Sequence, residues 1–216
     1  MSIETTMARY YADRAAEYER IYHKPERQAD LQELREFVEN TFADAKVLEV
    51  ACGTGYWTEI VARSAASVMA TDLNEEVLNI ARSKPIDPRR ATIRRADAYA
   101  LDVADASYTG GLAAFWWSHV KKSRLPDFLT NFHRVLSPGA RVVFIDNRYV
   151  EGSSTPVSRS DEEGNTYQLR RLDDGTAHEV LKNFPTESEL RAAVAGSVTD
   201  LRVELLRYYW VLSYVR

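Results

Sequence analysis

The sequence contains one cysteine, Cys52, among its 216 residues. A single cysteine excludes an intramolecular disulfide and is typical of a reducing cytoplasm. Because there is no Cys/His cluster, we expect no metal site. No apolar run approaches the ~20 residues of a membrane span, and residues 1–22 are too polar and charged for a signal peptide. We therefore expect a cytoplasmic protein that does not associate with membranes.

The composition is otherwise that of an ordinary globular protein, with 45% hydrophobic and 28% charged residues. A chain of this length can bury a complete core, so we expect a single domain over residues 1–216, as a monomer or homodimer. The net charge of −4 argues against broad affinity for nucleic acids. The basic segment 82–95 has no interleaved aromatic residues, which favours a solvated edge over a nucleic-acid site. A small molecule is the expected partner.

An apolar run over residues 47–51 ends in a Gly-x-Gly turn, and a helical pattern begins near Tyr56. A short β-branched run that stops at glycine is typical of a buried parallel strand. Gly53 and Gly55 let the backbone approach a ligand, and the N–H groups of the turn favour an anionic one. Glu49 lies inside the strand and needs a partner, which a cationic ligand or a backbone donor could supply. The pattern predicts a nucleotide-type site.

Three kinds of nucleotide site compete for this turn. A dinucleotide site requires a third glycine three residues after the second, where this chain has Thr58. A phosphate-binding P-loop requires a lysine after the turn, and none lies between Val47 and Arg63. The string Glu49-Val50-Ala51-Cys52-Gly53-Thr54-Gly55 resembles the first motif of the class I S-adenosylmethionine (SAM) dependent methyltransferases. An NAD-type oxidoreductase and a SAM-binding module without catalytic activity remain as alternatives.

The resemblance implies SAM as the cofactor and a Rossmann-like α/β fold, with a seven-stranded, mostly parallel sheet, an antiparallel C-terminal edge and helices on both faces. It also implies cofactor contacts at the carboxyl ends of the first four strands. These contacts are Glu49, Ala51, Cys52, Gly53, Gly55, Asp72, Leu73, Asp97, Ala98 and Phe115. In the adenine site, Asp97 would accept from the exocyclic amine and the Ala98 amide would donate to the ring.

Asp72 ends a strand predicted for residues 67–71, about one strand–helix–strand unit after Gly55. A carboxylate at this position can accept both hydroxyl groups of a ribose. The alternative role, which can coexist, is an N-cap for the helix that begins near Asn74. We favour the ribose role.

Residues 7–22 are predicted to form one helix rich in aromatic residues, with Tyr11, Arg14 and Tyr18 on one face. The Tyr-Tyr-x-x-Arg-Ala-x-x-Tyr pattern resembles the N-terminal segment that covers the cofactor in many small-molecule methyltransferases. We therefore expect residues 1–42 to form a helical lid in which Tyr11, Arg14 and Tyr18 contact the cofactor. A helix that merely packs on the domain is the alternative.

A fourth strand is predicted within residues 106–115, and Trp116, Trp117 and His119 follow it. Ligands of open α/β sheets bind at the carboxyl ends of strands, so these side chains are candidate substrate contacts. His119 could be a general base. Alternatively, it caps or positions the helix that begins near Ser123, and the pattern does not choose between the two.

A helix over residues 125–136 is followed by the turn Ser137-Pro138-Gly139 and a fifth strand over residues 141–146. Residues 166–172 and 177–183 flank Asp173-Asp174-Gly175, which indicates a β-hairpin. We expect residues 148–184 to be an inserted loop and hairpin on the substrate side. A capping box that starts at Thr186 begins another helix, and two alternating segments end the chain as antiparallel strands.

Arg170 and Arg171 are adjacent on the expected hairpin, so only one of them can face inward. Together with Arg148 and Lys121 they favour an anionic acceptor, which a guanidinium can grip with two hydrogen bonds. The hairpin also resembles that of small phosphonate or carboxylate O-methyltransferases of natural-product pathways. We expect methyl transfer to an oxygen of a carboxylate, phosphonate or hydroxyl group. Two solvated arginines are the alternative.

Overall fold

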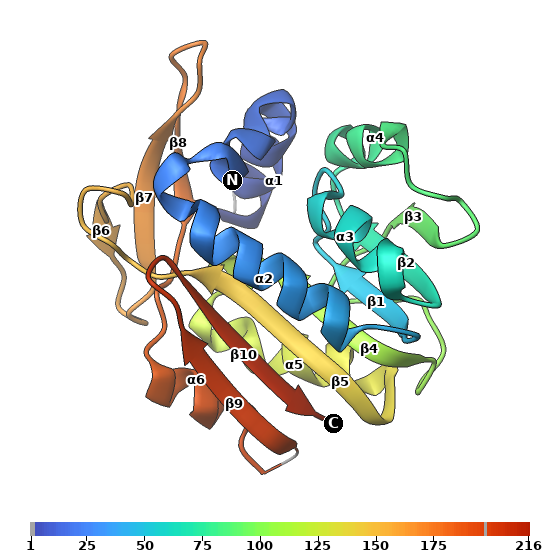
Figure 1. The fold of residues 1–216 in the computed structure, drawn as a ribbon. Helices are drawn as coiled ribbons and strands as arrows, with labels where there is room; N and C mark the ends of the chain where they lie inside the picture. The colour runs from blue at the N-terminus through green and yellow to red at the C-terminus, as the bar shows by residue number, and fades with distance from the viewer. Residues whose placement is uncertain (1–2, 197) are drawn as a thin grey trace.

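Seven strands form the central sheet of the computed structural model, which describes residues 3–196 and 198–216. Their order across the sheet is β3-β2-β1-β4-β5-β10-β9 (Figure 1). The strands are β1 (Lys46–Val50), β2 (Ser67–Asp72), β3 (Ala91–Arg95), β4 (Tyr108–Ala114), β5 (Leu136–Asn147), β9 (Thr199–Leu205) and β10 (Tyr209–Val215). Strands β1 to β5 pair in parallel, whereas β10 is antiparallel to β5 and β9. The predicted Rossmann-like fold class is confirmed.

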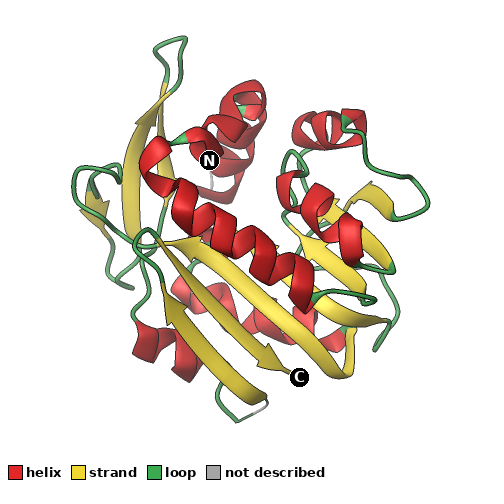
Figure 2. Ribbon diagram, in the orientation of Figure 1, coloured by secondary structure: helices red, strands yellow, loops and turns green. Residues whose placement is uncertain are grey.

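Helices cover both faces of this sheet (Figure 2). One face carries α2 (Gln28–Thr41) and α3 (Tyr56–Ser64), and the other carries α5 (Leu125–Arg134) and α6 (Glu187–Val194). Successive strand residues point to opposite faces, so Val47 packs with α2 and α3 while Leu48 packs with α5. Because both faces are covered, four successive residues of β1 are buried, as expected of a parallel strand.

The N-terminal segment is broken into several short pieces. It comprises α1 (Ile3–Asp13) and two 3₁₀ helices, η1 (Ala15–His23) and η2 (Pro25–Arg27). The prediction of one continuous helix over residues 7–22 is therefore wrong. Tyr10 is buried against the hairpin, whereas Tyr22 is buried in the main core, and the break between α1 and η1 lets both side chains reach their separate clusters.

A second, three-stranded sheet lies beyond one end of the first and comprises β6 (Arg159–Ser160), β7 (Thr166–Arg171) and β8 (Ala177–Leu181). Strands β7 and β8 form the predicted hairpin, whose turn is closed by the hydrogen bond from the Leu172 amide to the Thr176 carbonyl. Helix α1 packs beside β8 (Figure 1) through Met7, which contacts Leu181 and Tyr167. The N-terminal helix and the inserted hairpin thus share one small apolar cluster.

The remaining boundaries follow the sequence closely, with one exception. Helix α4 (Glu75–Ser83) begins directly after Asn74, as predicted, and the 3₁₀ helices η3 (Trp117–His119) and η4 (Lys122–Arg124) precede α5. At the start of α6, Thr186 forms the predicted capping box with Glu189. However, β5 already begins at Leu136. The expected turn at residues 137–139 is instead an irregularity within the strand, where the register with β4 shifts and Gly139 takes a positive φ of 83°.

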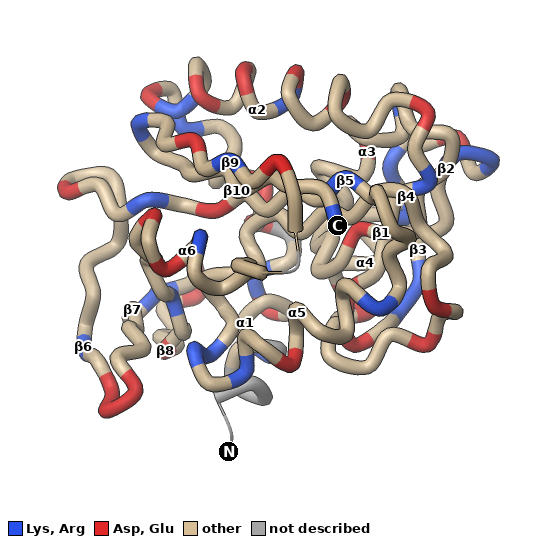
Figure 3. The backbone as a smooth tube through the Cα atoms, turned by 90° about the horizontal axis from the view of Figure 1, so that it is seen from below, with Lys and Arg blue, Asp and Glu red and all other residues tan. Residues whose placement is uncertain are grey.

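The basic segment 82–95 lies at the β3 edge of the sheet (Figure 3), and its charges contact neighbouring groups. Arg89 donates to the Asp87 carboxylate, and Arg95 donates to the backbone carbonyl of Leu73. Two further observations apply to residues 3–196 and 198–216. No helix there combines the length and apolar character that crossing a membrane requires, and no cluster of three or more His, Cys, Asp and Glu side chains could hold a metal ion.

Candidate functional site

The carboxyl ends of β1, β2 and β4 border a cavity of about 270 Å³, which we call the first pocket. The chain leaves β1 toward β2 on one side and β4 lies on the other, so this is the switch point at which open α/β sheets bind ligands. Nine of the expected cofactor contacts line it: Tyr11, Tyr18, Ala51, Gly53, Asp72, Leu73, Asp97, Ala98 and Phe115. The other four, Arg14, Glu49, Cys52 and Gly55, are not among the described residues that line this pocket.

The two glycines of the turn have different surroundings. Gly53 takes a φ of 55°, and a Cβ added there would meet only Tyr18 Cε1, at 3.8 Å. Gly55 takes a φ of 80°, and a Cβ there would lie 3.0 Å from Ala81 Cβ and 3.2 Å from Ala81 Cα. Gly53 therefore keeps the pocket open, whereas Gly55 lets the turn pack against α4. The structure gives Gly55 a packing role, and the ligand contact expected there stays a prediction.

Asp72 holds the turn and the start of α4 together. Its Oδ2 accepts from the Gly53 amide at 2.9 Å, and its Oδ1 accepts from the Asn74 amide at 2.9 Å. Burial raises the pKa of the carboxyl group, while these backbone donors oppose the rise. The N-cap of α4 is Asn74, so Asp72 is not itself the cap. A carboxylate has about four acceptor sites, so both oxygens keep capacity for hydroxyl donors.

Glu49 is buried, and its partner lies within the protein. Its Oε2 accepts from the Thr58 hydroxyl at 2.6 Å, which makes neither a cationic ligand nor a backbone donor necessary. Burial raises the pKa of Glu49 to about 8 despite this hydrogen bond. Thr58 stands where a dinucleotide site has its third glycine, and the bond to Glu49 explains a hydroxyl-bearing residue at that position.

A second cavity of about 400 Å³, the second pocket, lies between the N-terminal segment and the inserted hairpin. Among the described residues that line it, Glu17 is the one acid and seven side chains are basic: Arg14, Arg20, Lys24, Arg27, Arg170, Arg171 and Lys182. Arg170 is half-buried and donates to Gln168 Oε1 from Nε and Nη2, at 3.1 and 2.7 Å, whereas Arg171 is exposed. Both arginines line the pocket, but the alternation of the strand buries only Arg170 in part, so which of them would hold an anion stays a prediction.

Four residues line both pockets and form the wall between them: Tyr11, Tyr18, Phe115 and His119. His119 Nδ1 lies 2.7 Å from the Leu181 carbonyl oxygen, which can only accept, so Nδ1 carries the proton. Nε2 is then an acceptor, and the Tyr11 hydroxyl donates to it at 2.7 Å. Burial, with the nearby charge of Lys182, holds the pKa of His119 well below its ordinary value. His119 is therefore a neutral ring that ties α1 to β8.

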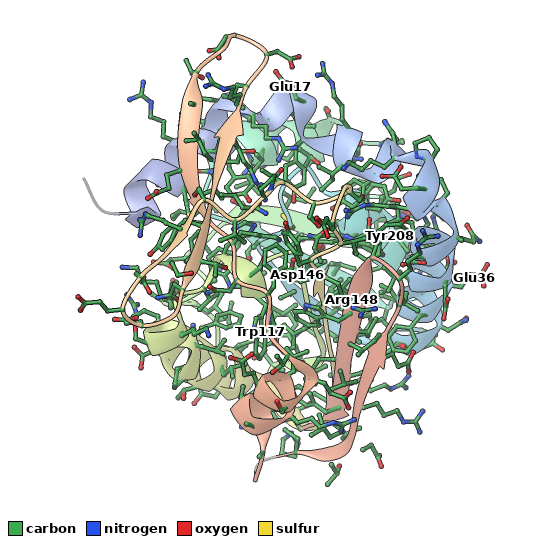
Figure 4. The ribbon with its side chains drawn as sticks, turned by 90° about the vertical axis from the view of Figure 1, so that its left-hand side faces the viewer. Glu17, Glu36, Trp117, Asp146, Arg148 and Tyr208 are labelled. Carbon is green, nitrogen blue, oxygen red and sulfur yellow. The ribbon has the colours of Figure 1, made fainter. Side chains whose placement is uncertain are left out.

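Several expected substrate contacts lie elsewhere. Trp117 is buried in the core, where its ring packs against Phe144 and Trp210. Trp116 lines the first pocket. Arg148 donates to the backbone carbonyl of Leu206, and its own amide donates to the Tyr208 carbonyl at 2.9 Å (Figure 4). It is held at the β9–β10 turn and is not among the described residues of the second pocket.

The other departures from expectation have local causes. Lys121 lines the first pocket. The Cys52 amide donates to the Thr71 carbonyl at 2.9 Å, which leaves its buried thiol inside the fold. The Arg14 guanidinium lies 5.6 Å from the centre of the Tyr18 ring and faces the second pocket. Their roles as ligand contacts stay predictions, because a sequence pattern indicates the strand or helix of a residue but not its neighbours.

A buried ion pair at the floor of the second pocket was missed. Lys182 Nζ donates to Asp146 Oδ1 at 2.8 Å and to Ser118 Oγ at 2.6 Å, and the Ser118 amide donates to Asp146 Oδ2 at 2.9 Å. Burial lowers the pKa of Lys182 to about 8, although Asp146 acts in the opposite direction. Figure 4 shows Asp146 in the interior of the molecule. The available signal was a lysine directly after the apolar residues Val180 and Leu181, since such a lysine needs a partner.

Known proteins resemble this chain in two ways. Residues 47–139 match the family model described as a methyltransferase domain. In sequence, the chain is 36% identical over 101 residues to a demethylmenaquinone methyltransferase of Tropheryma whipplei (strain Twist), covering 47% of this chain and 41% of that protein. The enzyme of the same description from Staphylococcus aureus (strain MRSA252) is 30% identical over 107 residues, covering 47% of this chain and 42% of the relative. The chain thus spans less than half the length of these relatives.

In structure, the likeness extends over the whole chain. A complex of DhpI with SAM and HEP has a TM-score of 0.81 at 24% identity, covering 100% of both chains. A SAM-dependent methyltransferase of Methanosarcina mazei has a TM-score of 0.67 at 19% identity, covering 83% of this chain and 96% of the other. At these identities the likeness concerns the fold. The expected cofactor and enzyme class are those of the matched family. Residues 47–139 thus match a methyltransferase domain, and the chain has the fold of the class I SAM-dependent methyltransferases, as its glycine-turn motif predicts.

Proposed function

We propose that this protein transfers the methyl group of SAM to an oxygen of a small anionic acceptor, a carboxylate or a phosphonate. The observation that carries the proposal is the placement of the second pocket. It is lined by seven basic side chains and one acid, and it shares a four-residue wall with the pocket at the switch point of the sheet. A cationic cavity concentrates anions, and the shared wall brings an acceptor beside the cofactor site.

The first pocket fits the cofactor in the groups that it presents. Gly53 leaves room for a ligand to approach the backbone, and Asp72 offers carboxylate oxygens that would accept from the ribose hydroxyls. Asp97 and Ala98 would hold the adenine. Bound SAM would supply a methyl group on a positively charged sulfur, which is a good leaving group. Residues 1–42 would serve as the lid, and residues 148–184 would supply the acceptor side.

The residues of the second pocket would act mainly by orientation. Arg170 presents a half-buried guanidinium, and a bidentate grip on a carboxylate or phosphonate fixes the direction of its oxygens. Alignment of a nucleophile with its target can supply roughly 7–11 kcal/mol of the barrier. An ionised acceptor needs no general base, and both ring nitrogens of His119 are already occupied by Tyr11 and Leu181.

Two other acceptors make contrasting demands. A neutral hydroxyl group would need a base, and the neutral His119 would have to give up its bond with Tyr11 to serve as one. Demethylmenaquinone, the acceptor named for the relatives, is a large apolar ring, whereas the second pocket is lined with charge. The sequence identity with those relatives covers less than half of this chain. It therefore supports SAM as the cofactor more than it supports demethylmenaquinone as the acceptor.

The test is formation of S-adenosylhomocysteine from SAM with butyrate, propylphosphonate, butanol and demethylmenaquinol as acceptors. We expect turnover with the two anions alone. Arg170→Lys keeps the charge but loses the fork, so it should raise KM for the anion about tenfold. Arg89→Lys makes the same change at an exposed arginine outside both pockets and should stay near wild type. Turnover with demethylmenaquinol or butanol alone would overturn the anionic acceptor.

Equilibrium dialysis with labelled SAM and NAD separates the proposal from an oxidoreductase, and SAM binding without any turnover would indicate a binding module.

A further inference from the structure

A buried cation lies in the second pocket away from Arg170. Arg27 is 6% exposed, its Nη1 donates to Asn147 Oδ1 at 2.9 Å, and its Nη2 donates to Ser153 Oγ at 3.0 Å. Its guanidinium carbon lies 5.1 Å from the centre of the Tyr208 ring. Among the described side chains, no carboxylate lies within ion-pair distance of Arg27. Ser153 links Arg27 to the exposed carboxylate of Glu26, and an anion in the pocket would add a direct counter-charge to this buried cation.

A second cation converges on the same point. Lys24 Nζ donates to the backbone carbonyl oxygen of Ser153 at 3.0 Å, so Lys24 and Arg27 meet at one residue. Burial lowers the pKa of Lys24, and the nearby charge of Arg27 lowers it further. The acid nearest in sequence, Glu26, is exposed and accepts from Ser153 Oγ at 3.1 Å. The chain therefore holds two like charges side by side at the wall of a cavity.

This pair is distinct from the cationic group at the shared wall. Arg170 donates to Gln168, lies 5.9 Å from the centre of the Tyr10 ring, and exerts its charge on Tyr11 and His119. The charges of both Arg170 and Arg27 lower the pKa of Lys182, which lines the same pocket. Its own charge is matched by Asp146. One pocket thus contains two separate cationic centres, and the one that includes Arg170 is beside the cofactor pocket.

Resting on the proposed function, we infer that the acceptor carries a second anionic group, and that Arg27 and Lys24 bind this group while Arg170 orients the oxygen to be methylated. The acceptor class is then a short chain with an acidic group at each end, such as a dicarboxylate or a phosphonocarboxylate. The cavity of about 400 Å³ provides room for a chain of a few carbons between the two ends.

The test compares matched acids with one and two anionic groups. Binding of 3-phosphonopropionate, propylphosphonate, succinate and butyrate is measured by calorimetry on the protein loaded with S-adenosylhomocysteine, and turnover is measured with SAM. We expect each two-acid probe to bind at least tenfold more tightly than its one-acid partner. Lys24→Met should abolish this advantage and weaken binding of the one-acid probe much less than that of the two-acid probe, whereas Arg170→Lys should weaken both.

Two further variants sharpen the result. Arg27→Met should act as Lys24→Met does, and because Lys24 is only half-buried, its variant decides the question if the Arg27 variant does not fold. Arg89→Met removes one positive charge outside both pockets, where Arg89 pairs with Asp87, and should retain the full advantage. The inference is wrong if one-acid and two-acid probes bind equally tightly, or if Lys24→Met weakens the binding of both by the same factor. Neither outcome would contradict methyl transfer to anions. If no anion of either kind is bound or methylated, the proposed function itself fails.

Discussion

The phenol of Tyr11 donates a 2.7 Å hydrogen bond to Nε2 of His119, across 108 positions of the sequence. The opposite ring nitrogen donates to the Leu181 carbonyl oxygen at 2.7 Å. One imidazole therefore joins α1, the end of β4 and the inserted β8, and it does so in the wall between the two pockets. Movement of Tyr11 away from His119 would break this hydrogen bond, so the pair links the N-terminal segment to the wall between the two pockets.

Tyr11→Phe should loosen the N-terminal segment. The substitution leaves the acceptor of a buried histidine unpaired, which costs about 1–3 kcal/mol. We expect a lower Tm and faster amide exchange in α1 and β8. Adding S-adenosylhomocysteine should slow exchange over residues 7–22 in the wild type. Tyr214→Phe is the matched control, because it removes a bond of the same kind to His133, at 2.6 Å and outside both pockets, and should leave exchange in α1 unchanged.

The pH dependence of the rate distinguishes an orienting histidine from a general base. An acceptor that is already ionised gives a kcat that stays flat from pH 7 to 9, and His119→Ala should retain most of it at saturating acceptor. The apparent KM for the anion should rise near pH 8, because Lys182, whose pKa is lowered to about 8 by burial, loses its charge there. A kcat that rises through a single pKa in the wild type and collapses in His119→Ala would mean that His119 acts as a general base.

Gly53→Ala and Gly55→Ala should separate cofactor binding from folding. Left-handed backbone costs a non-glycine residue roughly 1–2 kcal/mol, and both positions incur this cost. At Gly53 the added Cβ meets open space in the first pocket, so affinity for S-adenosylhomocysteine should fall with a small change in Tm. At Gly55 the Cβ meets the Ala81 backbone at 3.2 Å, so Tm should fall much further. Calorimetric titration and thermal unfolding of both variants test this prediction. A larger loss of affinity at Gly55, or a larger fall in Tm at Gly53, would contradict it.

Asp72→Ala should weaken SAM binding at least tenfold, because charge-assisted hydrogen bonds contribute about 1.5–3 kcal/mol each. A 2′,3′-dideoxy analogue of the cofactor lacks the ribose hydroxyls and should be affected less by the same substitution. Some loss should remain even for the analogue, since the Gly53 amide also loses its 2.9 Å acceptor. Equal losses for both cofactors, measured by equilibrium dialysis, would mean that Asp72 acts through the turn alone.

Glu49→Gln should stabilise the protein at alkaline pH. Burial raises the pKa of Glu49 from 4.5 to about 8, so between these values the folded state binds the proton that the unfolded state has lost. Wild-type stability should then fall as pH rises through that window, relative to a glutamine that does not titrate. The gap should widen by on the order of 4 kcal/mol between pH 5 and 8.5. Urea unfolding at both pH values measures it, with Glu36→Gln, an exposed carboxylate on α2, as the control. A pH-independent gap would mean that Glu49 is ionised in the fold.

Local patterns along the chain were sufficient to predict most of the helices and strands of the fold. Helix α3 begins at Tyr56 and strand β2 covers residues 67–71, as predicted, because an amphipathic period or a β-branched run is a property of neighbouring residues. The hairpin turn at residues 173–175 and the capping box at Thr186 were predictable for the same reason. The glycine-turn motif also specified the switch point, since the carboxyl ends of parallel strands meet at one edge of a sheet.

Side-chain partners far apart in the sequence were decided only by the tertiary structure. Arg27 lies 126 positions from Ser153, and Lys182 lies 36 positions from Asp146, so no local period connects them. Trp117 and His119 follow the same strand, yet one enters the core and the other ties α1 to β8, because the 3₁₀ turn η3 rotates them apart. Whether a charge is paired, buried or left facing a cavity depends on which elements the fold brings against it. The residues 47–55 therefore indicate the cofactor site, while the proposed acceptor site lies where the N-terminal segment and the hairpin meet.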